Sequence, residues 1–216
     1  MTLDYDDLLN SIMSSLDRIK QVDVKDIPNI DLYMDQLLTF MDDSLHKSVR
    51  RPGADKILTK TMINNYAKND LLPPPVKKKY SKDHIIILIF IYYYKSILSI
   101  NDIHTLLKPM RDRFGDTDKE VNLKDIYQMI YDEQDDIIDN LKKDIEKKYK
   151  VAIDDTFPDA PEDERAELQL LNFISMLSYD VFMKKLLIET MLDHVESVCM
   201  NKTDTKGGKE SRKKKK

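Results

Sequence analysis

The sequence predicts a mainly α-helical protein. Its 216 residues include only 4 glycines and no tryptophan, which argues against a turn-rich β-sandwich or barrel. Apolar residues recur at three- and four-residue spacing along most of the chain, as they do on one face of an amphipathic helix. The length allows one compact domain or two small ones, and either can bury a hydrophobic core.

Two amphipathic helices are expected first. The stretch "LDYDDLLNSIMSSLDRIK" at 3–20 has helical periodicity. Pro28-Asn29 breaks the chain after it, which defines an N-terminal segment at 1–27. A second helix is expected over 31–43, and a basic loop follows at 44–58.

A short helix is expected at 59–69, because the run Pro73-Pro74-Pro75 lacks amide donors and restricts the residue before it. The turn at 73–80 carries three consecutive lysines. Ser81 then suits the N-cap of a helix over 82–98. Its apolar run "IIILIFIYYY" is well short of the roughly 18–20 residues that cross a bilayer, so we expect a buried core helix.

Three further helices complete the chain. Ser99 or Asn101 caps a helix over 101–109, and longer helices are expected over 122–149 and 162–200. The last of them has apolar residues on more than one face, which suits either the centre of a bundle or a dimer seam. The segment after it is basic and has no apolar residues, so we expect it to be disordered.

Catalytic chemistry is not supported by the residue pattern. The four histidines lie in separate segments, so none forms the spacing that places two metal ligands on one helical face. Gly53 and Gly115 are isolated, so no glycine-rich loop is available to cradle a phosphate. Cys199 has no catalytic partner in view, and packing is its simpler role. We therefore predict no enzyme activity, no metal site and no cofactor.

The cytoplasm is the expected compartment. A single cysteine cannot form an internal disulfide, so nothing requires an oxidising environment. The N-terminus "MTLDYDDLLNSIM" is acidic, whereas a secretory leader begins with basic residues and continues as an apolar run.

Positive charge is concentrated in two segments, although the net charge of the chain is −4. Residues 44–84 hold ten Lys and Arg against three Asp. Residues 201–216 hold eight Lys and Arg against two acidic residues. Such a localised excess is the electrostatic footprint of a protein that binds a polyanion.

The helix expected at 59–69 has one polar face. Lys60, Asn64 and Lys68 follow at i, i+4 and i+8, with Thr61 and Asn65 beside them. In a major groove, asparagine pairs with adenine, and lysine contacts guanine or phosphate. The simpler alternative is an amphipathic surface helix followed by a solvated charge run.

Several separated motifs resemble a known family. The order of four motifs resembles the winged helix-turn-helix of MerR-type regulators. These motifs are Asn65-Tyr66, Asp70-Leu71-Leu72-Pro73, the basic turn from Lys77 to Ser81, and Ser99-Ile100-Asn101-Asp102-Ile103. More closely, "IDLYMDQLLTFM", "LTKTMINNYAKNDLLPPPVKKKY" and "ILSINDIHTLL" resemble an uncharacterised bacterial family, domain of unknown function eighteen-thirty-six, over roughly residues 28–110.

The resemblance implies a MerR-like core. In it, 31–43 would be the first helix of the helix-turn-helix, 59–69 the recognition helix and 73–80 the wing, with 82–98 and 101–109 as supporting helices. Two features differ from MerR proteins. The loop at 44–58 is longer than the usual three- or four-residue turn, and Asn64-Asn65-Tyr66 stands where Arg-Tyr-Tyr is typical.

Our hypothesis from the sequence is a homodimeric DNA-binding protein, a transcriptional regulator with unassigned operator and effector. Its expected layout is an N-terminal helix at 1–27, a MerR-like core at 28–115, a C-terminal helical region for dimerisation at 116–200 and a disordered basic tail at 201–216. The alternative is a helical protein–protein interaction module that has lost DNA binding. The predicted contacts to double-stranded DNA are Lys60, Thr61, Asn64, Asn65, Tyr66, Lys68, Lys77, Lys78, Lys79 and Tyr80.

Overall fold

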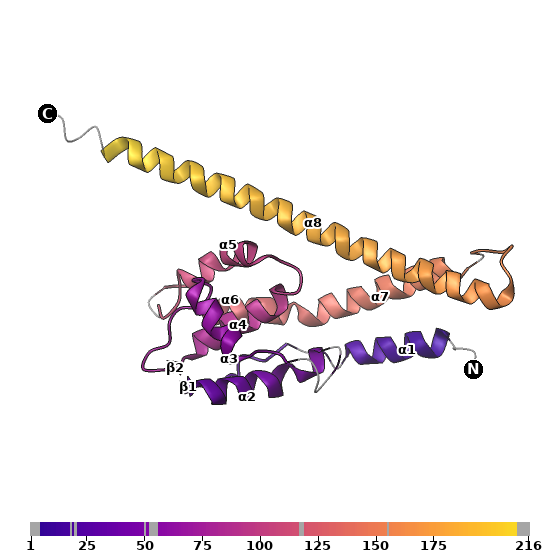
Figure 1. Ribbon diagram of the computed structural model, residues 1–216, viewed down its shortest axis with the longest axis horizontal. Helices are drawn as coiled ribbons and strands as arrows, with labels where there is room; N and C mark the ends of the chain where they lie inside the picture. The colour runs from indigo at the N-terminus through magenta and orange to yellow at the C-terminus, as the bar shows by residue number, and fades with distance from the viewer. Residues whose placement is uncertain are drawn as a thin grey trace.

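The prediction of a mainly helical protein is confirmed. The computed structural model describes residues 5–17, 19, 21–49, 51, 56–116, 119–154 and 156–210. Its helices are α1 (Tyr5–Leu16), α2 (Met34–Leu45), the short 3-10 helix η1 (His46–Ser48), α3 (Lys60–Lys68), α4 (Lys82–Tyr94), α5 (Ile100–Arg111), α6 (Leu123–Asp132), α7 (Gln134–Ile153) and α8 (Glu162–Glu210). Two short strands, β1 (Leu32–Tyr33) and β2 (Lys79–Tyr80), form a ribbon beside them (Figure 1).

Helix α4 is the centre of the main core. Its residues from His84 to Ile91 are all buried, and α5, α6 and β2 pack against it. The segment before β1, residues 21–31, is called the arm, and its side chains Val22, Val24 and Ile27 close the same core. The expected buried core helix is thus confirmed, and none of the described helices is long and apolar enough to cross a membrane. Ser81 and Ser99 are the N-caps of α4 and α5, as predicted.

The ribbon joins the segment before α2 to the segment after α3. β1 and β2 are antiparallel, with Leu32 opposite Tyr80 and Tyr33 opposite Lys79. A tight hairpin precedes β2: the Val76 amide donates to the Lys79 carbonyl (3.1 Å), and the Lys79 amide donates to the Val76 carbonyl (2.9 Å). We call residues 76–79 the lysine hairpin, because lysines occupy both positions of its two-residue turn.

The helix expected at 122–149 is two helices, which meet at Glu133. α6 is held by the main core, where the buried Tyr127 hydroxyl donates to the Val22 carbonyl (2.6 Å). Gln134 is buried as well and accepts a bond from the Gln21 amide. These contacts attach α6 and the start of α7 to the arm, and Leu123 and Tyr127 belong to the main core, which therefore extends beyond the boundary expected at 115. α7 then leaves the core to pack against α8.

Helix α8 is longer than predicted, since it continues from the expected end at 200 to Glu210. Extending an existing helix gains one hydrogen bond per residue without a new nucleation step. The rest of the predicted tail, 211–216, lies outside the described residues. A second, smaller core centred on Ile145, Ala152 and Phe173 joins α7 and α8, with side chains of α1 against it.

Candidate nucleic-acid interface

Helix α3 has sharp ends. At its start, the Thr59 side chain accepts the Met62 amide (3.2 Å). At its end, the Asn69 side chain donates to the Asn65 carbonyl (2.7 Å), and Asp70 turns the chain with φ of 55°. The helix therefore stops before the three prolines, as the sequence predicts.

The two faces of α3 differ as the spacing predicts. Ile63 and Tyr66 are buried, and Met62 packs against the core. The other side chains of interest are exposed: Lys60, Thr61, Asn64, Asn65 and Lys68. Among the described residues, the ion pairs lie elsewhere in the chain. The outer face of α3 thus presents two asparagines and two lysines, and no ion pair among the described residues involves these lysines.

The two tyrosines of the predicted contact set do not lie on this surface. Tyr66 is 8% exposed and Tyr80 is 4% exposed, and burial raises the pKa of both phenols. The Tyr80 ring packs edge-on against His84, with ring centres 5.3 Å apart. The prediction that they contact DNA is therefore corrected: they hold α3 and the ribbon on the core.

The lysine hairpin presents its charges at a strained turn. Lys77 and Lys78 are exposed, with φ of 51° and 64°. Positive φ at both central residues is the mark of a type I′ turn, which favours Asn-Gly. Lys79 differs from them, since it is half-buried and its ammonium lies 5.0 Å from the centre of the Tyr33 ring.

Not every cation of the basic segment is available to a partner. The Lys82 ammonium donates to the carbonyls of Val24 (2.8 Å) and Ile27 (3.3 Å) and to the side chain of Asn29 (3.2 Å). Burial lowers the pKa of Lys82. This lysine fastens the arm to the start of α4, so it belongs to the support of the site.

Arg111 is a supporting residue that the sequence analysis missed. Its guanidinium donates to the Asp70 carbonyl and to the His104 carbonyl (3.0 Å). It thereby ties the turn after α3 to the end of α5. No local pattern indicates this role, because Asp70 and Arg111 are 41 residues apart.

His84 connects the hairpin to the core helix. Its Nδ1 accepts the backbone amide of Ser81 (2.9 Å), and the ring packs against Phe114 at 4.6 Å between centres. Because Nδ1 is an acceptor, the neutral ring carries its proton on Nε2. Burial lowers the pKa of this imidazole, so His84 serves as a neutral capping group.

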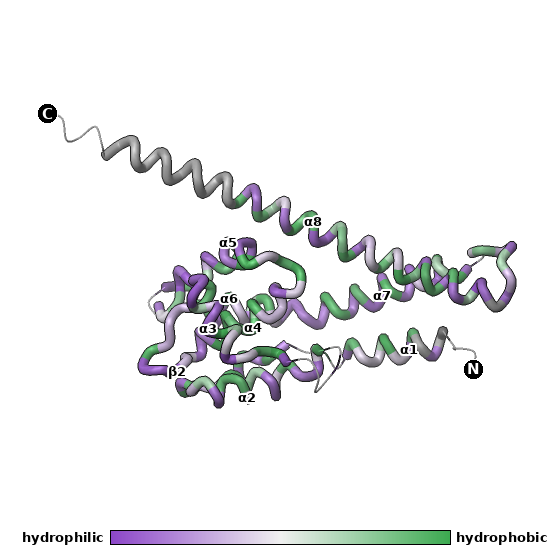
Figure 2. Tube along the Cα trace, in the orientation of Figure 1, coloured by the Kyte–Doolittle hydropathy of each residue, from purple (hydrophilic) through white to green (hydrophobic). Residues whose placement is uncertain are grey.

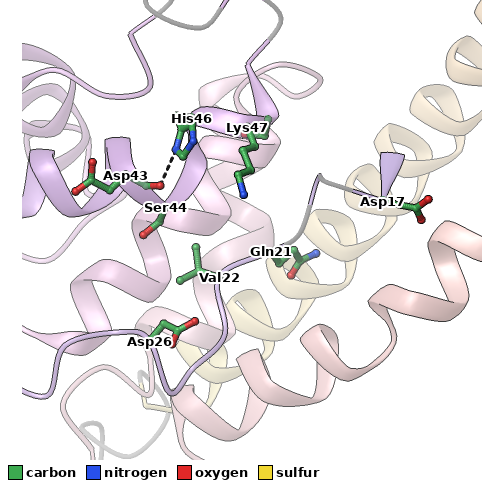
Figure 3. Close-up of a pocket in the computed structure, with 9 residues that line it drawn as sticks. Asp17, Gln21, Val22, Asp26, Asp43, Ser44, His46 and Lys47 are labelled. Carbon is green, nitrogen blue, oxygen red and sulfur yellow. Dashed lines mark hydrogen bonds between the residues drawn. The ribbon is translucent and has the colours of Figure 1, made fainter. Parts of the chain in front are cut away.

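A separate cavity of about 400 Å³ lies between the arm, the end of α2 and η1 (Figure 3). Two of its polar side chains, His46 and Ser48, are hydrogen-bonded within the protein. His46 Nδ1 donates to the Asp43 carbonyl (2.7 Å), and the Ser48 hydroxyl bonds to the Leu45 carbonyl and to the Tyr92 hydroxyl (both 2.7 Å). These contacts close the end of α2. Within the described residues, no group of three or more His, Cys, Asp or Glu is arranged to hold a metal ion.

Among curated proteins and solved structures, none matches the chain. One family model matches residues 22–130, a range that begins in the arm, includes α3 and the ribbon, and ends in α6. The match covers just over half of the chain, which therefore belongs to the family "Domain of unknown function (DUF1836)".

Proposed function

We propose that the protein binds double-stranded DNA and acts as a transcriptional regulator of MerR-like type. In this proposal, the outer face of α3 enters the major groove, and the lysine hairpin contacts the phosphate backbone as a wing. The order of α2, α3 and a hairpin that pairs back to the start of α2 supports a winged helix-turn-helix. A DNA target also implies a cytoplasmic location. The operator and any effector are unassigned.

The lysine hairpin carries this proposal. A left-handed conformation costs a residue other than glycine roughly 1–2 kcal/mol, and the hairpin places Lys77 and Lys78 there in succession. Asp70 and Phe157 also have positive φ, but each stands alone, whereas in the hairpin two such residues are consecutive. Strained backbone tends to occur at functional sites. Two charges at the tip of a short ribbon suit a phosphate backbone, which attracts lysines regardless of DNA sequence.

The outer face of α3 is the candidate for sequence readout. Asn64 and Asn65 are exposed, and an asparagine side chain can form two hydrogen bonds to adenine in the major groove. Lys60 and Lys68 flank them, one turn of helix away on either side. Because Asn64-Asn65-Tyr66 stands where an arginine is typical of MerR proteins, we expect the two lysines to supply most of the affinity for DNA. The two asparagines would supply the preference for a DNA sequence.

The test is a fluorescence-anisotropy titration of the full chain with genomic DNA fragments at several salt concentrations. A variant with Lys60→Gln and Lys68→Gln should bind more weakly, and its slope of log K against log salt should be less steep by about 1.8. The matched control is Lys143→Gln with Lys147→Gln, which removes two exposed lysines of α7. Absence of binding at low salt, or equal losses in both variants, would refute the proposal.

The proposed functional unit is a homodimer that pairs through α8. Three apolar side chains on one face of α8 are exposed: Leu171, Phe182 and Leu186. Phe182 follows Leu171 by eleven residues, or three helical turns, and Leu186 follows Phe182 by four residues, or one turn. Phe173, on the opposite face, is buried against α7. Figure 2 shows how hydrophobic residues continue along α8 beyond its overlap with α7. Each such side chain contributes about 1.5–3 kcal/mol when it is buried, so a second copy would stabilise this face.

The exposed face of α8 also favours the alternative, a helical interaction module without DNA binding. The two functions differ in their salt dependence. Binding through phosphates weakens steeply with salt, whereas association through apolar side chains does not. A chain that self-associates but does not bind DNA fragments at low salt would therefore support the interaction module.

A further inference from the structure

The outward face of the ribbon carries three side chains in a row. Tyr33 lies opposite Lys79 in the strand register, and Val76 bridges to Lys79 from the hairpin. Cross-strand partners lie on the same face of a sheet. Leu32 and Tyr80, which alternate with them, are buried on the other face. Val76 is 67% exposed and Tyr33 53% exposed, so an apolar side chain and an aromatic ring flank the lysine.

Tyr33 is close enough to the hairpin tip to share a ligand with it. Neighbouring strands lie about 4.8 Å apart and rise about 3.3 Å per residue, so the ring lies within roughly 10 Å of the backbone of Lys77 and Lys78. The Lys79 ammonium lies over the ring at 5.0 Å from its centre. The phenol therefore stands beside a cation at the base of a basic hairpin.

We infer that Tyr33 is a further DNA-contacting residue, whose hydroxyl donates a hydrogen bond to a backbone phosphate on the Lys79 side of the ribbon. A tyrosine hydroxyl is a good donor, and such contacts to phosphate fix the register of a protein on the duplex. Asp31 and Asp35 are exposed near Tyr33 in the chain, and because carboxylates repel phosphate, the contact is expected on the side of the ring that Lys79 covers. This inference rests on the proposed function.

The test compares three variants of the full chain with the same DNA fragment used for the wild type. Tyr33→Phe removes the hydroxyl and keeps the ring under Lys79. We expect about tenfold weaker binding with an unchanged salt slope, because a bond to a charged partner is lost and no protein charge is removed. Lys79→Ala should instead make the slope less steep by about 0.9. The control is Tyr179→Phe, which removes the hydroxyl of an exposed tyrosine on α8 and keeps its ring beside Phe182, so the apolar face of the helix is unchanged.

The outcomes separate this inference from the proposed function. If the wild type binds and Tyr33→Phe binds within twofold of it, Tyr33 is not a contact and only the inference fails. The inference also fails if Tyr179→Phe loses as much affinity as Tyr33→Phe. If the wild type does not bind DNA at low salt, the proposed function fails and the inference fails with it. A selective loss in Tyr33→Phe, with the salt slope kept, supports both.

Discussion

Replacing the turn of the lysine hairpin should change stability and DNA affinity in opposite directions. The double variant Lys77→Asn with Lys78→Gly introduces the pair that a type I′ turn prefers. Both native lysines have positive φ. Glycine removes the strain at the second position but gains flexibility in the unfolded chain, and asparagine tolerates the first position well. We expect the free energy of unfolding to rise by about 1 kcal/mol, or Tm by about 2–4 °C for a chain of this size.

The same variant removes two charges from the proposed phosphate contacts. Each lost contact makes the slope of log K against log salt less steep by about 0.9. Two contacts change it by about 1.8, so between 50 mM and 200 mM salt the wild-type affinity should fall about twelvefold further than that of the variant. Thermal unfolding by circular dichroism and anisotropy titrations at four salt concentrations measure both effects on one protein sample.

Two results would refute this reasoning. If the variant is less stable than the wild type, the lysines are not strained in the turn, and the argument from strain to function is lost. If the variant is more stable but keeps the salt slope of the wild type, the hairpin does not contact phosphates. The variant with Lys143→Gln and Lys147→Gln controls for net charge, because it removes the same charge from α7 without altering a turn.

Three other changes test the core and the dimer. Phe182→Asp should convert a dimer to monomers in sedimentation velocity, because it places a charge in the apolar face of α8. Tyr127→Phe should lower the free energy of unfolding by about 1–3 kcal/mol in urea titrations, since it leaves the buried Val22 carbonyl without its donor. Burial lowers the pKa of His84 below its ordinary 6.5, so on acidification the imidazole is protonated in the unfolded chain before it is protonated in the folded one. The free energy of unfolding should therefore decrease as the pH falls below 6.5. In urea titrations at several pH values, His84→Gln should show a smaller decrease.

Local sequence patterns were sufficient to predict which face of α3 is packed and which is polar. The spacing of Ile63 and Tyr66 against Asn64 and Lys68 is enough to separate a packed face from a polar one, because helical periodicity is a local property. The ends of α3 were equally predictable, since proline blocks a helix wherever it stands. The class of the fold followed from the same kind of local signal.

Long-range contacts account for what the sequence analysis missed. Tyr80 looks like a surface residue of the basic turn, but its burial depends on how β2 packs on α4. The break at Glu133 has no proline or glycine to mark it. It follows from the contacts of Tyr127 and Gln134 with the arm more than 100 residues earlier. The role of Arg111 at the Asp70 carbonyl likewise depends on tertiary packing.

The proposed interface is built on elements too short to be stable alone. A nine-residue helix such as α3 is marginal in water without packing, and so is a two-stranded ribbon. Buried residues therefore hold both elements: Ile63 and Tyr66 fix α3, and Leu32 and Tyr80 fix the ribbon. Lys82 and Arg111 add donors to backbone carbonyls on either side of them. Lys82 and Arg111 thus bind the protein itself, whereas the lysines on the outer face of α3 and at the hairpin tip are exposed to a polyanion, and at the tip the backbone accepts strain to present them.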